Sequence, residues 1–185
     1  MDFYLLWAAF LLGIIEGVTE FLPVSSTGHL IIGAELLGFT DPSSKVFEIF
    51  IQLGAIFAVV VEYRKKILVT FIGIQTDKVA QVFTKNLIIA FIPAAILGFF
   101  FHSLIKLHLF NPIVVGIALI VGGVLMIIIE KKLPNRSKVD IDKISKKQAL
   151  IVGVAQCFSL IPGISRAAST IMGGLIGGLD RKTAT

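Results

Sequence analysis

The sequence predicts an all-α integral membrane protein built as an inverted-topology repeat, with two re-entrant, broken helix pairs and several transmembrane helices. Three observations lead to this fold class. Hydrophobic residues make up 56% of the chain and charged residues only 16%, whereas soluble domains average about 45–50% and about 25%. Acidic side chains interrupt the first apolar segment, and a proline break followed by serine occurs near both ends of the sequence.

The first 37 residues do not fit a simple membrane span. Residues 3–22 are long enough to cross, but they carry Glu16 and Glu20 and stop at Pro23. Residues 28–37 are then too short to cross back, because a transmembrane helix needs about 20 residues. We therefore expect two half-helices that enter and leave on one side. Such a break is tolerated only inside protein or beside a water-filled cavity.

The next apolar segments are predicted membrane spans at 46–61, 87–101 and 110–129. Only the last is long enough to cross by itself, so the other two need polar flanking residues that reach the interface. Residues 67–74 are too short to cross and are expected at the membrane interface.

Basic residues predict the topology. The loop 130–147 holds seven Lys and Arg residues against three acids, which places it in the cytoplasm by the positive-inside rule. Alternating from there, 102–109 is outside, 62–86 with its five basic residues is inside, and 39–45 is outside.

An internal repeat relates the two ends of the chain. Gly13 to Glu16 matches Gly153 to Gln156, and Pro23-Val24-Ser25-Ser26 matches Pro162-Gly163-Ile164-Ser165 with a one-residue gap. Three predicted spans separate the copies, so the second copy is inverted in the membrane. The two proline-broken elements are expected to meet near the midplane, where such breaks form binding sites.

The repeat also predicts the domain organisation. We expect a single membrane domain over 1–185, with the first repeat at 1–130, a cytoplasmic loop at 131–147 and the start of an incomplete second repeat at 148–185. Few residues follow the second copy, so we expect the chain to lack roughly three C-terminal spans by comparison with the first repeat.

Two carboxylates are the first candidates for function. Glu16 and Glu20 lie one helical turn apart, so they share a face. In an apolar cavity they would repel unless a cation lies between them. The pair therefore suits a divalent metal ion shared with substrate phosphates, or an acid and base pair. Packing against lysines elsewhere is the alternative.

Hydroxyl groups and a histidine follow the first proline break. Ser25, Ser26, Thr27 and the Gly28 amide lie at a predicted helix start, which is a favourable anion site. His29 can act as acid, base or nucleophile. The serines could instead only cap the helix, and His29 could be a buried structural residue.

Arg166 is the corresponding candidate in the second half. It lies between apolar segments and needs an anionic partner, for which a phosphate held by two guanidinium N–H groups is suited. Structural pairing with Glu16 or Glu20 is the alternative. An acid pair, hydroxyls, a histidine and an arginine in one membrane cavity indicate phosphoryl chemistry on a lipid-borne phosphate. The sequence has no P-loop and no His-Glu-x-x-His zinc motif, which argues against nucleotide hydrolysis and zinc peptidase chemistry.

These segments resemble the signatures of the undecaprenyl-diphosphate phosphatase family, the bacitracin-resistance proteins. The first signature falls on the run from Glu16 to Leu30, and the second on the run from Pro162 to Arg166; residues 47–54 resemble the stretch between them. After Arg166 the family usually has Ser-Gly-Ala-Thr, whereas this chain has Ala167-Ala168-Ser169-Thr170. Family members also run longer than this chain.

The resemblance implies an inner-membrane hydrolase that removes the terminal phosphate of undecaprenyl diphosphate. It implies roles in carrier-lipid recycling for cell-wall (peptidoglycan) synthesis, in cell shape and in bacitracin resistance. It implies a divalent cation, Mg²⁺ or Ca²⁺, at Glu16 and Glu20. The catalytic residues expected are Glu16, Glu20, Ser26, His29 and Arg166, and the phosphate-binding residues expected are Ser25, Thr27, Gly163, Ser165 and Thr170.

The expected partners are the membrane and a polyprenyl diphosphate lipid, with no nucleic acid; a homodimer is one expected assembly. Ser26 and His29 remain competing nucleophiles, with Ser26 preferred. The alternative function is a membrane transporter or lipid translocase, because inverted repeats with broken helices are also a transporter architecture.

Overall fold

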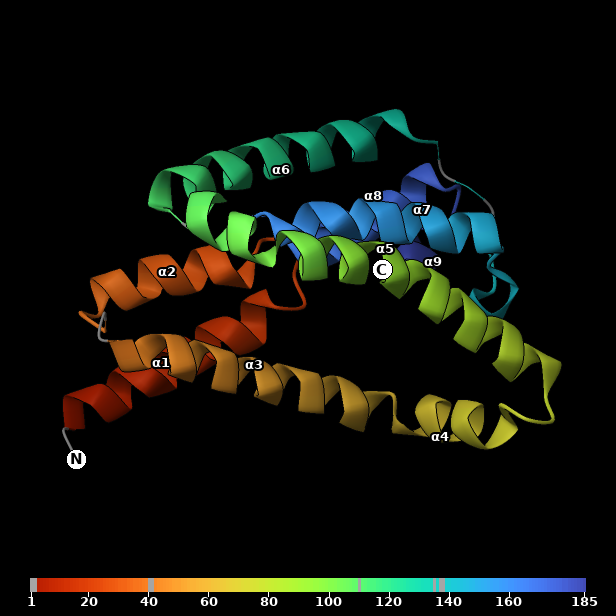
Figure 1. The fold of residues 1–185 in the computed structure, drawn as a ribbon, viewed down its shortest axis with the longest axis horizontal. Helices are drawn as coiled ribbons and strands as arrows, with labels where there is room; N and C mark the ends of the chain where they lie inside the picture. The colour runs from red at the N-terminus through yellow and green to blue at the C-terminus, as the bar shows by residue number, and fades with distance from the viewer. Residues whose placement is uncertain (1–2, 40–41, 110, 135, 137–138) are drawn as a thin grey trace.

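The computed structural model describes residues 3–39, 42–109, 111–134, 136 and 139–185, and all secondary structure in these residues is helical. Figure 1 shows the helices as an elongated bundle. The longer elements are α1 (Phe3–Thr19), α2 (Ser26–Leu36), α3 (Pro42–Glu62), α4 (Arg64–Gly73), α5 (Lys78–Leu109), α6 (Pro112–Lys132), α7 (Lys146–Gln156) and α8 (Arg166–Ile176). The shorter ones are the 3₁₀ turns η1 (Ile141–Lys143) and η2 (Cys157–Leu160) and the helix α9 (Arg181–Ala184).

Two helical hairpins form the centre of the molecule. The first hairpin consists of α1 and α2, and the second of α7, η2 and α8; in each, the two arms pack on one another. In Figure 1 the arms of the two hairpins extend toward opposite ends of the molecule, and their tips meet near its middle. The predicted all-α membrane fold with broken, re-entrant helix pairs is thus confirmed.

The two hairpins share one backbone plan, in a register that differs from the predicted one. Ser25 caps α2 and Ser165 caps α8, each by accepting a hydrogen bond from the amide three residues later. The same separation in sequence relates Gly38 to Gly178, which both have positive φ beyond the end of their helix. The equivalence therefore needs no gap and pairs Ser165 with Ser25 rather than with Ser26. Helix capping fixes this register, and the prolines lie at different places in the turns before it.

Close packing repeats in the same register. A Cβ added to Gly33 would lie 3.1 Å from Ile15 Cδ1 and 3.2 Å from Leu12 Cδ2. A Cβ added to Gly173 would lie 2.5 Å from Ala155 Cβ and 3.1 Å from Val152 Cα. These contacts join equivalent positions, because Leu12 and Ile15 correspond to Val152 and Ala155. A glycine on the second arm lets it approach the first arm in both hairpins.

The helices between the hairpins are long and apolar. α5 and α6 are each apolar enough to cross a membrane, and α3 with α4 forms a third candidate span bent by 69°. The segment 102–109, expected outside the membrane, is not a separate loop, because its residues are the last turns of α5. No helix breaker separates Phe101 from Leu109, so the polar side chains that end the apolar run do not end the helix. The expected short segment at 67–74 is mostly α4.

α5 and α6 pack closely against the hairpins. A Cβ at Gly28 in α2 would lie 3.0 Å from Leu119 of α6, and one at Gly163 would lie 2.6 Å from the Val115 carbonyl oxygen of α6. One at Gly153 in α7 would lie 2.6 Å from the Ala90 carbonyl oxygen of α5. α6 therefore contacts the tips of both hairpins and sets their relative position.

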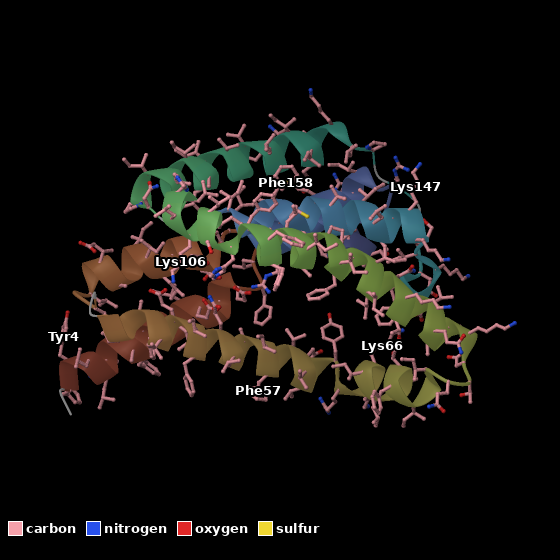
Figure 2. The ribbon with its side chains drawn as sticks, viewed as in Figure 1. Tyr4, Phe57, Lys66, Lys106, Lys147 and Phe158 are labelled. Carbon is pink, nitrogen blue, oxygen red and sulfur yellow. The ribbon has the colours of Figure 1, made fainter. Side chains whose placement is uncertain are left out.

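The segments predicted to lie inside the cell gather at one end. Lys66 of α4 pairs with Asp142 of η1 at 2.5 Å, and Asn86 of α5 donates to the Ile144 carbonyl. Figure 2 shows Lys66 and Lys147 in the same half of the molecule, and Tyr4 at the other end. Since the predicted cytoplasmic segments meet without being adjacent in sequence, the arrangement agrees with the predicted alternation of loops.

Candidate active site

The turn of the first hairpin holds a strained serine. Ser25 has φ 66° and ψ 97°, and it is the single non-glycine residue with positive φ in the described part of the chain. Its Oγ accepts from the Gly28 amide at 3.4 Å, and its carbonyl oxygen lies 2.9 Å from His29 Nδ1. A backbone of this kind costs about 1–3 kcal/mol and tends to occur at functional sites. It directs the start of α2 toward the tip of the second hairpin.

Glu20 joins the two hairpins. Ser26 Oγ donates a hydrogen bond to Glu20 Oε2, and Arg166 Nη2 donates to Glu20 Oε1 at 3.4 Å. Ser26 and Arg166 are the first residues of α2 and α8 and are equivalent in the repeat. One carboxylate is therefore held by corresponding residues of both copies.

A polar pocket of about 60 Å³ lies at this junction. It is lined by Glu20, Ser25, Ser26, Thr27, Gln52, Ser159, Ile164, Ser165 and Arg166. The N-termini of α2 and α8 both face it, so their backbone amides and positive dipole ends act on the same volume. Together with the Arg166 guanidinium, they make the pocket suited to an anion that carries several oxygens.

The sequence analysis missed two polar residues of this pocket. Gln52 lies within the stretch 47–54, which was noted for its resemblance but not assigned a role. Ser159 occupies the position equivalent to Thr19, and both hydroxyls donate to a nearby backbone carbonyl of their own hairpin.

Glu16 lies behind the pocket and is 1% exposed. Neither of its carboxylate oxygens has a hydrogen-bond partner among the described residues. A buried carboxylate without partners is costly unless a cation or proton accompanies it. No cluster of three or more His, Cys, Asp or Glu side chains suited to a metal ion is present among the described residues. The two carboxylates fit a cation that takes its other ligands from water and substrate phosphates, as Mg²⁺ commonly does.

Besides Glu16, three other predicted site residues lie outside the pocket lining. His29 is exposed, and its Nδ1 faces the Ser25 carbonyl. Gly163, at φ 95°, allows the turn to approach the backbone of α6. Thr170 Oγ1 donates to the backbone carbonyls of Arg166 and Ala167. Ser25, Thr27 and Ser165 line the pocket, and their role in binding phosphate stays a prediction.

The chain is similar to known proteins over its whole length. The family model for bacitracin resistance protein BacA matches residues 9–185. Proteins named undecaprenyl-diphosphatase are similar over the whole chain: one from Pseudomonas fluorescens is 54% identical, one from Ectopseudomonas mendocina 51% and one from Neisseria meningitidis 50%. The chain covers 67% of the first two of these proteins and 68% of the third.

Proposed function

Because the chain belongs to the bacitracin resistance protein BacA family, we propose that it removes the terminal phosphate of undecaprenyl diphosphate and returns undecaprenyl phosphate to cell-wall synthesis. The observation that carries the proposal is the bridge at Glu20, where Ser26 and Arg166 meet on one carboxylate in a pocket faced by two helix N-termini. Phosphoryl transfer needs a nucleophile, a base and a positive group that binds phosphate. Here these would be the Ser26 hydroxyl, the Glu20 carboxylate and the Arg166 guanidinium.

The first step uses Ser26 as the nucleophile. Its Oγ already donates to Glu20, so that carboxylate takes the proton as Oγ attacks the terminal phosphorus. The Oγ–P bond forms, the bridging P–O bond breaks, and undecaprenyl phosphate leaves. A water molecule then attacks the phosphoserine and loses one proton to solvent, the Oγ–P bond breaks as Glu20 returns its proton to Ser26 Oγ, and inorganic phosphate is released. Direct attack by water is the competing route.

Arg166 binds the phosphate that is transferred. Its side chain is 64% exposed, lines the pocket and contacts Glu20 through Nη2, which leaves its other N–H groups available for phosphate oxygens. The amides at the starts of α2 and α8 add donors from either side. Donors placed where charge develops stabilise the transition state, and removing one typically costs about 10²–10³-fold in rate.

His29 acts as a positioning residue in this mechanism. Its Nδ1 contacts the Ser25 carbonyl, and its ring lies outside the pocket lining. The contact holds the strained Ser25 backbone from which Ser26 projects. The same position in the second hairpin is Ser169, whose Oγ donates to the Ser165 carbonyl at 3.0 Å. The shared contact supports a role in holding the turn rather than in bond making.

Glu16 and Glu20 would hold the divalent cation, Mg²⁺ or Ca²⁺. When bound, the cation neutralises charge on the diphosphate. Addition of a chelator is expected to stop phosphate release and Mg²⁺ to restore it. In Glu16→Gln the restored rate should be at least about 10²-fold lower, and the concentration of Mg²⁺ needed should rise. Full activity of Glu16→Gln in chelator would refute this assignment.

The decisive experiment separates phosphatase from transporter. Purified protein in detergent, where no gradient exists, is given undecaprenyl diphosphate, and released phosphate is measured. Ser26→Ala should abolish release while leaving substrate binding near normal, because the hydroxyl is needed only for bond making. Acid quenching and mass spectrometry should find phosphate on Ser26. Phosphate on His29 with an active Ser26→Ala variant would assign the nucleophile to His29, and absence of any release would favour the translocase.

The chain is proposed to span the bacterial inner membrane several times with its basic loop inside. In a Cys157→Ala background, a membrane-impermeant maleimide added to intact cells should label Lys106→Cys but not Lys147→Cys. The reverse pattern would invert the topology. A homodimer stays a prediction, and light scattering of the purified protein measures it.

A further inference from the structure

An apolar groove of about 410 Å³ lies beside the polar pocket. One wall is a single face of α5 between Leu97 and Leu109, and the other is formed by Cys157, Leu160 and Ile161 of the second hairpin. Leu160 packs next to α5, since a Cβ at Gly98 would lie 3.6 Å from its Cδ2. The α5 wall rises about 18 Å along its helix. The groove is therefore long and almost without polar atoms.

The groove and the polar pocket are two sides of one turn. Ser159 lines the pocket, while its neighbour Leu160 lines the groove. On the other side of the turn, the Ile164 amide donates to the Ile161 carbonyl at 3.1 Å, and these residues line the pocket and the groove respectively. Because consecutive Cα atoms are 3.8 Å apart, the pocket and the groove adjoin at this turn.

The repeat shows where this groove comes from. Leu160 occupies the position equivalent to Glu20. The first hairpin directs a carboxylate into the polar pocket at this position, whereas the second directs an aliphatic side chain against α5. The two copies have thus become different halves of one site, one polar and one apolar.

We infer that the groove between α5 and the second hairpin binds the prenyl chain of the diphosphate substrate, beginning with the isoprene units nearest the phosphates. This inference rests on the proposed function, because that function supplies the ligand with a charged end and an apolar chain. The groove matches it through its position next to the polar pocket and through its apolar composition. Its volume lies within the range of about 300–1,000 Å³ of small-molecule sites.

Cys157 allows a test that does not depend on turnover. It is the single cysteine of the chain, is partly buried, and lines the groove. In detergent, the rate at which N-cyclohexylmaleimide modifies Cys157 is measured with farnesyl methylenediphosphonate, which cannot be hydrolysed at its bridge. We expect at least about tenfold protection, and none from methylenediphosphonate without a chain. Arg166→Ala should abolish protection, because it releases the charged end.

Two outcomes of this labelling would overturn the inference. Equal protection by the chain-free diphosphonate would mean that closure of the polar site, not the prenyl chain, shields Cys157. Equal protection by a saturated alkyl phosphocholine would mean that any membrane lipid fills the groove. Failure of the phosphatase itself would instead appear as absent phosphate release with labelling protection intact.

A steric test uses two leucines of α5. Leu104 lines the groove and Leu107 does not, and both are exposed, at 54% and 78%. Leu104→Trp should raise KM for undecaprenyl diphosphate about tenfold, while kcat and hydrolysis of isopentenyl diphosphate stay within about threefold. Leu107→Trp is the matched control and should leave all of these unchanged. An unchanged KM in Leu104→Trp, or an equal effect of Leu107→Trp, would refute the groove assignment.

Discussion

The two hairpins have the same backbone and different chemistry. Each begins its second arm with a serine cap, closes on its first arm through a glycine, and ends at a glycine with positive φ. Their side chains differ at the positions that face the pocket: Ser26 in one copy corresponds to Arg166 in the other. The comparison separates what the fold requires, which is repeated, from what the reaction requires, which occurs once.

The surroundings of the hairpins differ as well. Gly153 of α7 lies against the backbone of α5, whereas a Cβ at the equivalent Gly13 of α1 would have nothing within 4 Å among the described residues. The second hairpin is therefore fixed by a close helix contact that the first lacks here. Substitutions at paired positions can measure each difference.

The largest effect is expected at Glu20. Glu20→Gln keeps the shape of the side chain but removes the charge that accepts the Ser26 proton and pairs with Arg166. Phosphate release should fall by about 10²–10³-fold. The control is Glu35→Gln on the exposed side of α2, which should keep its activity. Near-normal release by Glu20→Gln would show that the bridge between hairpins is structural only.

A somewhat smaller loss is expected when Arg166 is replaced. Arg166→Lys retains the charge but not the planar pair of donors, so it should lose about 10²-fold, almost as much as Arg166→Ala. Arg64→Lys, at an exposed arginine that donates to the Val61 carbonyl, controls for the substitution itself. If Arg166→Lys were close to wild type in steady-state kinetics, charge alone would be sufficient at this position.

Paired glycine substitutions test the packing difference through stability. Gly153→Ala places a methyl group 2.6 Å from a backbone oxygen, so either α7 or α5 must shift, at a cost of about 1–3 kcal/mol. Gly13→Ala meets open space and should be neutral or stabilising by up to about 1 kcal/mol, because alanine favours the helix. Thermal unfolding in detergent compares them. Equal melting temperatures would contradict the asymmetric packing.

The smallest effect concerns pH and Asp180, beyond the end of the second hairpin. Hydrogen bonds from the Thr183 side chain and the Val139 amide lower the pKa of Asp180 to about 2. A lowered pKa contributes stability that is present above the ordinary value near 4 and is lost as pH falls toward 2. The melting temperature of wild type should therefore exceed that of Asp180→Asn at pH 7, and the difference should shrink between about pH 4 and 2. A difference independent of pH would exclude the ionised carboxylate as its source. The equivalent position, Thr40, lies outside the described residues.

Sequence alone was sufficient for the fold class and for the meeting of the two broken helix pairs, while the pairing of Arg166 with Glu16 or Glu20 was only the alternative considered. A charged group in an apolar segment must have a partner, and two broken helices of opposite orientation place their tips together. The contact of Arg166 with Glu20 was the alternative considered for it, and its role in binding phosphate stays a prediction. At such positions the cost of burying an unpaired charge limits which arrangements are possible.

Other features depended on three-dimensional geometry. The register of the repeat could not be taken from prolines, because the cap hydrogen bonds of Ser25 and Ser165 determine where each helix starts. The apolar run 87–101 predicted a shorter helix than α5, because an apolar run ends at the first polar residues. A helix instead continues until a residue interrupts its backbone hydrogen bonds. The groove beside Leu160 has no sequence signal, since its walls come from segments distant in the chain.

The Glu20 bridge also determines when the site can first exist. Arg166 lies 146 residues after Glu20, which corresponds to roughly 7–30 s of synthesis at about 5–20 residues per second. During that time the first hairpin carries its carboxylates and Ser26 without the partner hairpin. A nascent chain therefore lacks the contact between Glu20 and Arg166 until the second hairpin inserts, so the proposed hydrolysis can begin only after both hairpins are in the membrane.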